Sequence, residues 1–151
     1  MEVTPRFLGE FLDSPTLLSL IIVTLLIFLT AFFVAAEFSI VKVRGARLDQ
    51  LVLEGNKRAI VAKKVIENLD DSFSASQFGI TLSALGLGWI GADQIEGMME
   101  PLVNVFNVSA TTSTFLSFLI AFLLIAFLHV VIGELVPKTL AVHEAEKLTL
   151  L

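Results

Sequence analysis

The most constraining feature of this sequence is a run without Asp, Glu, Lys or Arg from residue 101 to residue 133, ending in TFLSFLIAFLLIAFLHVVIG. A helix needs about 20 apolar residues to cross roughly 30 Å of hydrocarbon. Two more charge-free runs cover residues 14–36 and 72–92, and 56% of the chain is hydrophobic, above the usual range of soluble domains. We therefore predict an all-α integral membrane domain over residues 1–151, with spans at about 14–41, 72–92 and 112–136.

The second run is the least apolar of the three, because it is rich in Ser and Gly. A buried re-entrant segment is the alternative for it, since irregular or polar backbone at membrane depth must be covered by protein. The first run does not fit a cleaved signal peptide. An acidic GEFLD precedes it instead of a basic segment, and its apolar core is too long.

The basic residues predict the orientation. Seven of the ten Lys and Arg residues lie between Lys42 and Lys64, whereas residues 93–100 contain none. Cytoplasmic loops have the excess of Lys and Arg in membrane proteins. We expect a multi-pass protein of the inner (plasma) membrane, with the N-terminus and residues 93–100 outside and the C-terminus inside.

Residues 42–71 form the long polar stretch between the first two spans. Apolar residues recur there at helical spacing, and Gly55 and Asn56, which both tolerate positive φ, interrupt the pattern. We predict a cytoplasmic hairpin of two short amphipathic helices whose basic residues face lipid headgroups or a partner domain. A solvated linker is the alternative.

A cation site is predicted where the third run ends. A charged group at membrane depth costs at least about 2.5–3.5 kcal/mol, so Glu134 is a functional candidate. Pro137 has no N–H to bond the carbonyl of Gly133, and Gly133 adds flexibility, so we expect the helix to bend or open there. Carboxylate and carbonyl oxygens suit hard cations such as Mg²⁺, Ca²⁺ or Na⁺.

Further ligands should come from the other spans. On the second span a small, polar stripe falls on one helical face: Ser74, Gln77, Thr81, Ala84 and Gly88. Close helix packing is the alternative role for the stripe, although Gln77 is large and needs a polar partner. On the first span Glu37 shares a face with Thr30, and Ser39 lies beyond. Glu37 could instead reach the headgroups. A lone His129 is more often a hydrogen-bonded packing residue than a ligand.

Several classes of function are excluded. The chain has no cysteine, so disulfides and thiolate metal sites are impossible. It has no nucleophile motif, no phosphate-binding loop and no basic patch beyond the loop of residues 42–71. We therefore expect neither an enzyme nor a nucleic-acid partner.

Three segments together resemble a known family. These are AFFVAAEFSIVKVRGARLDQLV, SASQFGITLSALGLGWIG and VIGELVPKTLA. In order and spacing they resemble the transmembrane domain of the CorC/HlyC family, bacterial relatives of the CNNM (cyclin M) magnesium transporters. The resemblance implies three membrane helices, a cytoplasmic helical hairpin, a homodimer and Mg²⁺ export in exchange for Na⁺. Cytoplasmic regulatory domains follow in that family. The sequence stops at EKLTLL without a terminating signal, so we expect the natural protein to continue into them.

The motif assigns roles to residues. The Gly-Glu-x-x-Pro-Lys motif of the family matches Gly133, Glu134, Pro137 and Lys138, which implies that Glu134 and the Gly133 carbonyl bind the cation. The acid of the first span in the family matches Glu37.

Two positions depart from the family pattern. Many members have serines where this chain has Val34 and Ala36, and an asparagine pair where it has Ile80 and Thr81. Thr81 can still supply an oxygen, and Ser39 can substitute from nearly the same face as Ala36.

Two other functions remain possible interpretations of the sequence: a membrane-anchored regulatory or sensor module that binds a cation without transporting it, and a structural anchor.

Overall fold

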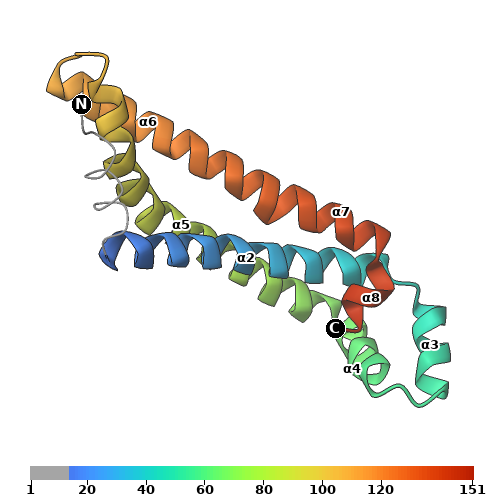
Figure 1. Cartoon of the computed structure of the whole chain (residues 1–151). Coiled ribbons are helices and arrows are strands. Elements are labelled where there is room, and N and C mark those ends of the chain that lie inside the picture. Colours follow the sequence, from blue (N-terminus) through green and yellow to red (C-terminus); the bar gives the residue numbers. More distant parts are fainter. Residues whose placement is uncertain (1–13) are drawn as a thin grey trace. The chain divides into compact units, whose positions relative to one another are not determined.

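The computed structural model describes residues 14–151, and within these the ordered segments are helices (Figure 1). The all-α prediction is therefore confirmed for this part of the chain, while the predicted external N-terminus lies outside the described residues. The helices are α2 (Ser14–Lys42), α3 (Gly45–Leu53), α4 (Lys57–Glu67), α5 (Leu69–Asn104), α6 (Ala110–Leu128), the π-helix η1 (His129–Leu135), α7 (Val136–His143) and α8 (Ala145–Thr149).

The described residues form two compact units. One contains residues 14–27 and 84–129, and the other contains residues 28–83 and 130–151. The core of the first unit is apolar and comes from three helices: Val23, Ile27, Leu87, Ile95, Ala121 and Ile125. Gly91 lies so close to α6 that a Cβ there would be 2.9 Å from Cδ1 of Ile125. Small residues of this kind let membrane helices approach closely.

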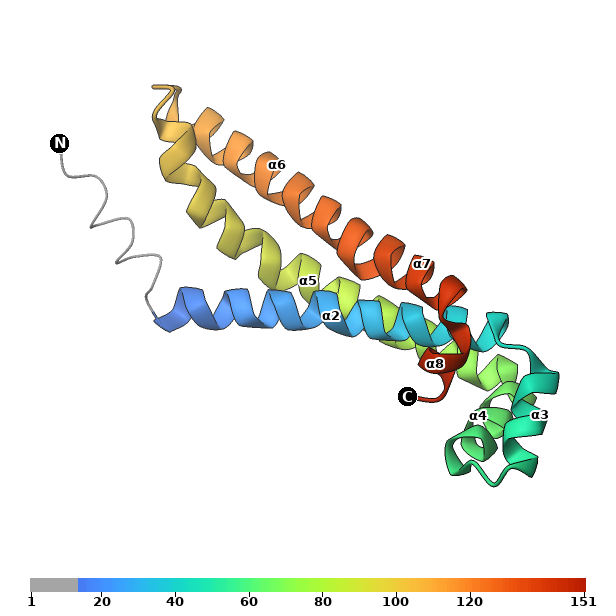
Figure 2. The ribbon, with the colours of Figure 1, turned by 45° about the vertical axis from the view of Figure 1, so that its right-hand side comes forward.

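The second unit contains a helical hairpin, in which α3 and α4 lie side by side (Figure 2). Its core is formed by Leu48, Leu51, Ala59 and Ala62. The turn comes at Gly55, whose φ of +82° favours glycine. Asn56 then caps α4, because its side-chain oxygen accepts hydrogen bonds from the backbone N–H groups of Arg58 and Ala59.

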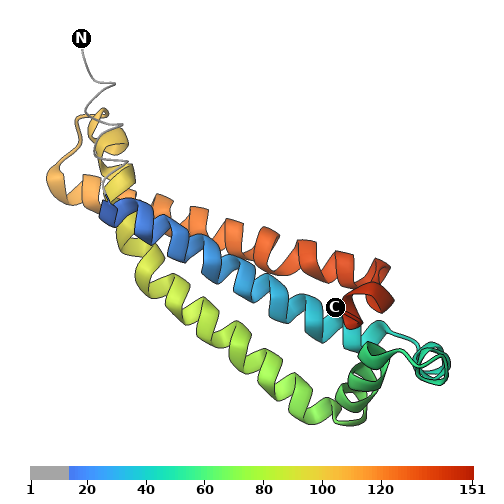
Figure 3. The ribbon, with the colours of Figure 1, turned by 60° about the horizontal axis from the view of Figure 1, so that its bottom comes forward.

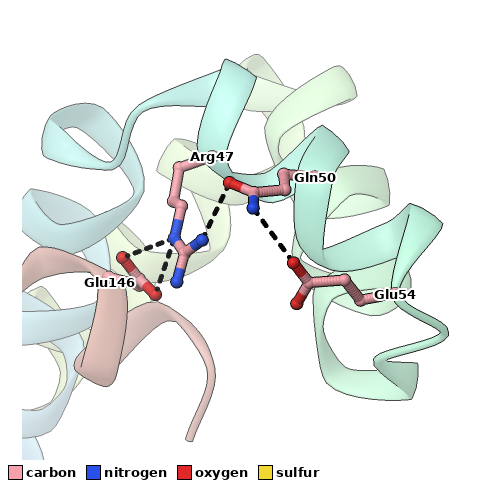
Figure 4. Close-up of polar contacts among 4 residues, drawn as sticks. All are labelled: Arg47, Gln50, Glu54 and Glu146. Carbon is pink, nitrogen blue, oxygen red and sulfur yellow. Dashed lines mark hydrogen bonds and ion pairs between the residues drawn. The ribbon is translucent and has the colours of Figure 1, made fainter.

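Polar contacts hold the hairpin together and attach α8 to it. Nε of Arg47 donates to both carboxylate oxygens of Glu146 at 3.3 Å, and Arg47 also bonds Gln50, which in turn bonds Glu54 (Figure 4). Between the two helices, Nζ of Lys63 donates to Asp49 at 2.6 Å. The hydrogen bond and the charge of Asp49 raise the pKa of the Lys63 ammonium, so the group stays charged at neutral pH.

The helix α5 is longer than the sequence pattern indicated. It runs without interruption to Asn104 and has Pro101 inside it (Figure 3). Residues 93–100, which we expect outside the membrane, are helical, and the side of the membrane on which they lie stays a prediction. The charges of that segment mark where an apolar run ends, and a helix can continue past that point into a polar environment.

Two segments are long and apolar enough to cross a membrane: Leu17–Lys42 and Ala110–His143. Only 22% and 17% of their most apolar windows are buried within the protein, which is not the environment of the core helix of a soluble domain. Large apolar side chains instead point outward all along α2, among them Ile21, Leu25, Phe28 and Phe32. A helix that is apolar all round and not covered by protein fits a lipid environment. The second predicted span, residues 72–92, lies within α5 and stays a prediction.

Candidate cation site

The helix becomes π-helical at the position where the sequence predicted that it would bend or open. Residues His129–Leu135 form a π-helix, and α7 follows directly with Pro137 in its first turn. In an α-helix the N–H of residue 137 would bond the carbonyl of Gly133, and proline has no N–H. A π-turn changes the bonding register by one residue, and such turns are frequent at functional sites. The helix is therefore widened rather than interrupted.

The motif residues differ in their exposure. Gly133 and Pro137 are buried, whereas Glu134 is half-buried and Lys138 is exposed. A buried carbonyl next to a half-buried carboxylate is a suitable pair of ligands for a hard cation.

One contact joins this region to the end of α2. Nζ of Lys138 lies 4.5 Å from the centre of the Phe38 ring, which is cation–π geometry. Phe38 stands between Glu37 and Ser39, so within the second unit the end of α2 that contains these two residues contacts the first turn of α7, which follows the η1 segment with Gly133 and Glu134. Glu37 is half-buried.

Ser39, a predicted ligand, has a buried hydroxyl close in sequence to the Phe38 contact. Its side chain is 1% exposed, and its Oγ donates a hydrogen bond to the carbonyl of Ala36 at 3.0 Å. A hydroxyl that donates its hydrogen keeps its oxygen lone pairs, which can bind a cation. Val34, at a position where many family members have serine, is buried and supplies no oxygen.

The predicted ligand face of α5 is not the face that packs within the second unit. Ser74, Gln77 and Thr81 are all exposed. The buried residues of this part of α5 are instead Ser76, Gly79 and Ser83. In the single chain, Ser74, Gln77 and Thr81 therefore lie on another side of the helix, and the role of Thr81 as a ligand stays a prediction.

The physical reason is the fit of α5 against α2. Gly79 lies against the ring of Phe33, where a Cβ would overlap the ring atoms. Ser83 is 1% exposed, and its Oγ donates to the carbonyl of Gly79 at 2.8 Å. Sequence reasoning missed Ser76 and Ser83. Their spacing around Gly79 is a weak signal, because Ser, Thr and Gly occupy more than one face of this helix.

The donor set restricts the kind of metal. Among the residues that the structure describes, no three His, Cys, Asp or Glu side chains come together. The available ligands are carboxylate, carbonyl and hydroxyl oxygens, which suit Mg²⁺, Ca²⁺ or Na⁺ better than transition metals.

His129 is half-buried in the first unit, where it lines a cavity with Gly88 and Phe122.

The long apolar helices of this domain agree with the comparisons with known proteins. Residues 20–151 match the family described as the cyclin M transmembrane N-terminal domain, and the chain belongs to this family. The resemblance drawn from the motifs is therefore confirmed. Since that domain is transmembrane, the chain is a membrane protein.

The chain is also similar to curated bacterial proteins. It is 58% identical to UPF0053 protein YrkA and 55% identical to UPF0053 protein YhdT, both of Bacillus subtilis, over 90% and 88% of its own length. It is 31% identical to the uncharacterized protein Rv1841c of Mycobacterium tuberculosis over 88% of its length. The chain spans 31%, 29% and 37% of these three relatives, respectively.

Proposed function

We propose that this domain moves Mg²⁺ out of the cell in exchange for Na⁺, with the cation site at the π-helical turn of Gly133 and Glu134. The observation that supports this most is the opened helix, because it combines a carboxylate with a buried carbonyl that Pro137 deprives of its α-helical partner. Carboxylate and carbonyl oxygens suit a hard cation such as Mg²⁺, and π-helical turns are frequent at functional sites. Membership of the cyclin M family supports transport rather than catalysis.

The ligands that we propose are Glu134, the Gly133 carbonyl and Ser39. Thr81 remains a candidate, although its exposure makes Ser39 the better one. Mg²⁺ prefers six oxygens at about 2.0–2.1 Å and releases water reluctantly, so a site with few protein ligands keeps several waters. Glu37 and Lys138 then set the charge around the site, and Pro137 maintains the opened turn.

The wider arrangement is also a proposal. We place three spans in the inner membrane with residues 42–71 in the cytoplasm, where regulatory domains of the same polypeptide follow. A second copy of the chain would cover the exposed polar face of α5. This face contains Ser74, Gln77 and Thr81, which would gain little from lipid but could pack against another helix.

Ion flux distinguishes the proposal from its main alternative, a cation-binding sensor without transport. The protein is reconstituted in liposomes that contain a Mg²⁺-sensitive dye, and a Na⁺ gradient is imposed in either direction. Transport coupled to Na⁺ predicts a Mg²⁺ signal that reverses with the gradient and is absent from empty liposomes. Cation binding in calorimetry without any flux under both gradients would instead support the sensor.

A further inference from the structure

A cavity of about 400 Å³ opens in the second unit, and Ser39, a proposed cation ligand, is one of the residues that line it. The cavity lies among the last turns of α2, one side of α4, and the residues around the end of α8. Its walls are mainly apolar: Ala36, Ile40, Val61, Val65, Leu148 and Leu150. This volume is within the range of about 300–1,000 Å³ that small-molecule sites occupy.

Two basic side chains also line this cavity. Lys57 and Arg58 are consecutive residues in the first turn of α4, and both are exposed. Nη1 of Arg58 donates to the carbonyl of Leu150 at 3.3 Å. Neither residue forms an ion pair with a carboxylate in the described part of the chain, whereas Arg47, Lys63 and Lys147 each do. The cavity therefore combines mainly apolar walls and the hydroxyl residues Ser39 and Thr149 with two cations that form no ion pair with a side-chain carboxylate of the described residues.

The position of the cavity indicates which ligand has this chemistry. Ala36 and Ile40 belong to the last turns of the apolar segment Leu17–Lys42, where a spanning helix leaves the hydrocarbon for the headgroups. The hairpin also exposes apolar residues here, with Leu53 89% and Val61 62% exposed. Basic and apolar residues together are typical of a surface that lies in the membrane interface.

We propose that this cavity binds an anionic phospholipid, whose phosphate contacts Lys57 and Arg58 and whose glycerol and upper acyl chain fill the apolar part. A free phosphate or a nucleotide would satisfy the cations but leave the apolar walls in contact with water. A zwitterionic lipid would fill the walls but bring its own positive charge to the cations. The site rests on α2 being a membrane helix and not on cation transport, so it can be tested separately.

The test uses the full chain in mild detergent and counts bound lipid by native mass spectrometry. The probes are short-chain phosphatidylglycerol, phosphatidylcholine of the same chain length, and inorganic phosphate. We expect phosphatidylglycerol to bind at least tenfold more tightly than phosphatidylcholine, with no competition from millimolar phosphate. In the double variant Lys57→Gln, Arg58→Gln this preference should fall tenfold or more.

Two further variants keep the result interpretable. The double variant Lys42→Gln, Lys64→Gln removes the same charge from the same region, but neither residue lines the cavity, so it should keep the preference. Val61→Trp fills the cavity without changing charge and should weaken the binding of both lipids. An equal loss in both charge variants would show general surface attraction and overturn the proposal. Competition by phosphate, or equal binding of the two lipids, would overturn it as well.

Discussion

Glu134 owes its environment to the residues around it in the sequence. The carbonyl of Gly133 precedes its amide group, and the next residue that could close an α-helical turn over that carbonyl is a proline. In the structure, the residues before this proline form a π-helical turn in place of an α-helical one. At the scale of single residues, the proposed site therefore depends on one charge, one missing N–H and one buried hydroxyl, and each can be removed separately.

The charge is tested by Glu134→Gln, which preserves size and shape. We expect it to abolish measurable Mg²⁺ binding in calorimetry while helical circular dichroism is unchanged, because an amide offers one neutral oxygen in place of a carboxylate. Glu67→Gln, at an exposed position on the hairpin, is the control and should bind like the parent. If Glu134→Gln binds as tightly as the parent, the site lies elsewhere, and Glu37 is the next residue to replace.

The missing N–H is tested by Pro137→Ala. The new N–H can bond the Gly133 carbonyl and return the π-turn to an α-helix, so every side-chain ligand stays while one backbone ligand is lost. We expect Mg²⁺ affinity to fall about tenfold, which is roughly 1.4 kcal/mol. Pro101→Ala, at a proline inside α5, should leave the affinity unchanged. Unaltered binding in Pro137→Ala would remove the Gly133 carbonyl from the ligand set.

The hydroxyl is tested by comparing Ser39→Ala with Thr81→Val. Ser39 is buried beside the Phe38 contact to α7, whereas Thr81 is exposed. We therefore expect Ser39→Ala to weaken Mg²⁺ binding several-fold and Thr81→Val to have little effect. The reverse order would show that α5 contributes its exposed face to the site, as it would in an assembly of two chains.

At the scale of elements, the relation between α2 and α5 in the second unit depends on Gly79. No side chain fits between this position and the Phe33 ring. The buried hydroxyls of Ser76 and Ser83 lie on the same face of α5, one turn before and one turn after the glycine. The packing of a ring against a glycine thus selects which polar groups of α5 are covered.

Gly79→Ala tests this contact. Overpacking of a tight interface costs about 1–3 kcal/mol, so we expect a lower midpoint of thermal unfolding in detergent. Gly97→Ala is the matched control, since it lies in the same helix and a Cβ there meets nothing within 4 Å. Alanine is the better helix former, so the control should be neutral or slightly stabilising. Equal midpoints in the two variants would mean that the close contact is absent in solution.

At the scale of the whole molecule, the question is how the helices cross the bilayer. Two segments, Leu17–Lys42 and Ala110–His143, have the length and composition to do so, and the family is transmembrane. The basic hairpin and the segment that connects α5 with α6 should then lie on opposite sides of the membrane.

Cysteine labelling in intact cells tests this topology, and the chain has no native cysteine to interfere. Suitable positions are Glu54 on the hairpin and Val105 after α5, which are both exposed. Asn56 and Asn104 are less suitable, because one caps α4 and the other accepts a hydrogen bond from Ser113. An impermeant maleimide should label Val105→Cys and not Glu54→Cys until the cells are opened. Labelling of Glu54→Cys from outside would invert the proposed orientation.

The sequence alone determined the features that arise from neighbouring residues. Apolar runs indicated α2 and the Ala110–His143 segment, because a helix that crosses the hydrocarbon of a membrane must be long and apolar. Gly55 and Asn56 indicated the turn of the hairpin, because a positive φ restricts the choice of residue. Glu134 and Pro137 indicated the opened helix, because the missing N–H is a property of the covalent chain.

Only the tertiary structure decided which face of α5 is covered and how far that helix extends. Small and polar residues occur on several sides of α5. Helical periodicity is therefore equally consistent with a covered face of Ser74, Gln77 and Thr81 and with one of Ser76, Gly79 and Ser83. The choice depends on a Phe33 ring that comes from a distant part of the sequence and fits only against the glycine. The end of α5 likewise lies beyond its apolar run, because charges limit contact with lipid and do not by themselves stop a helix.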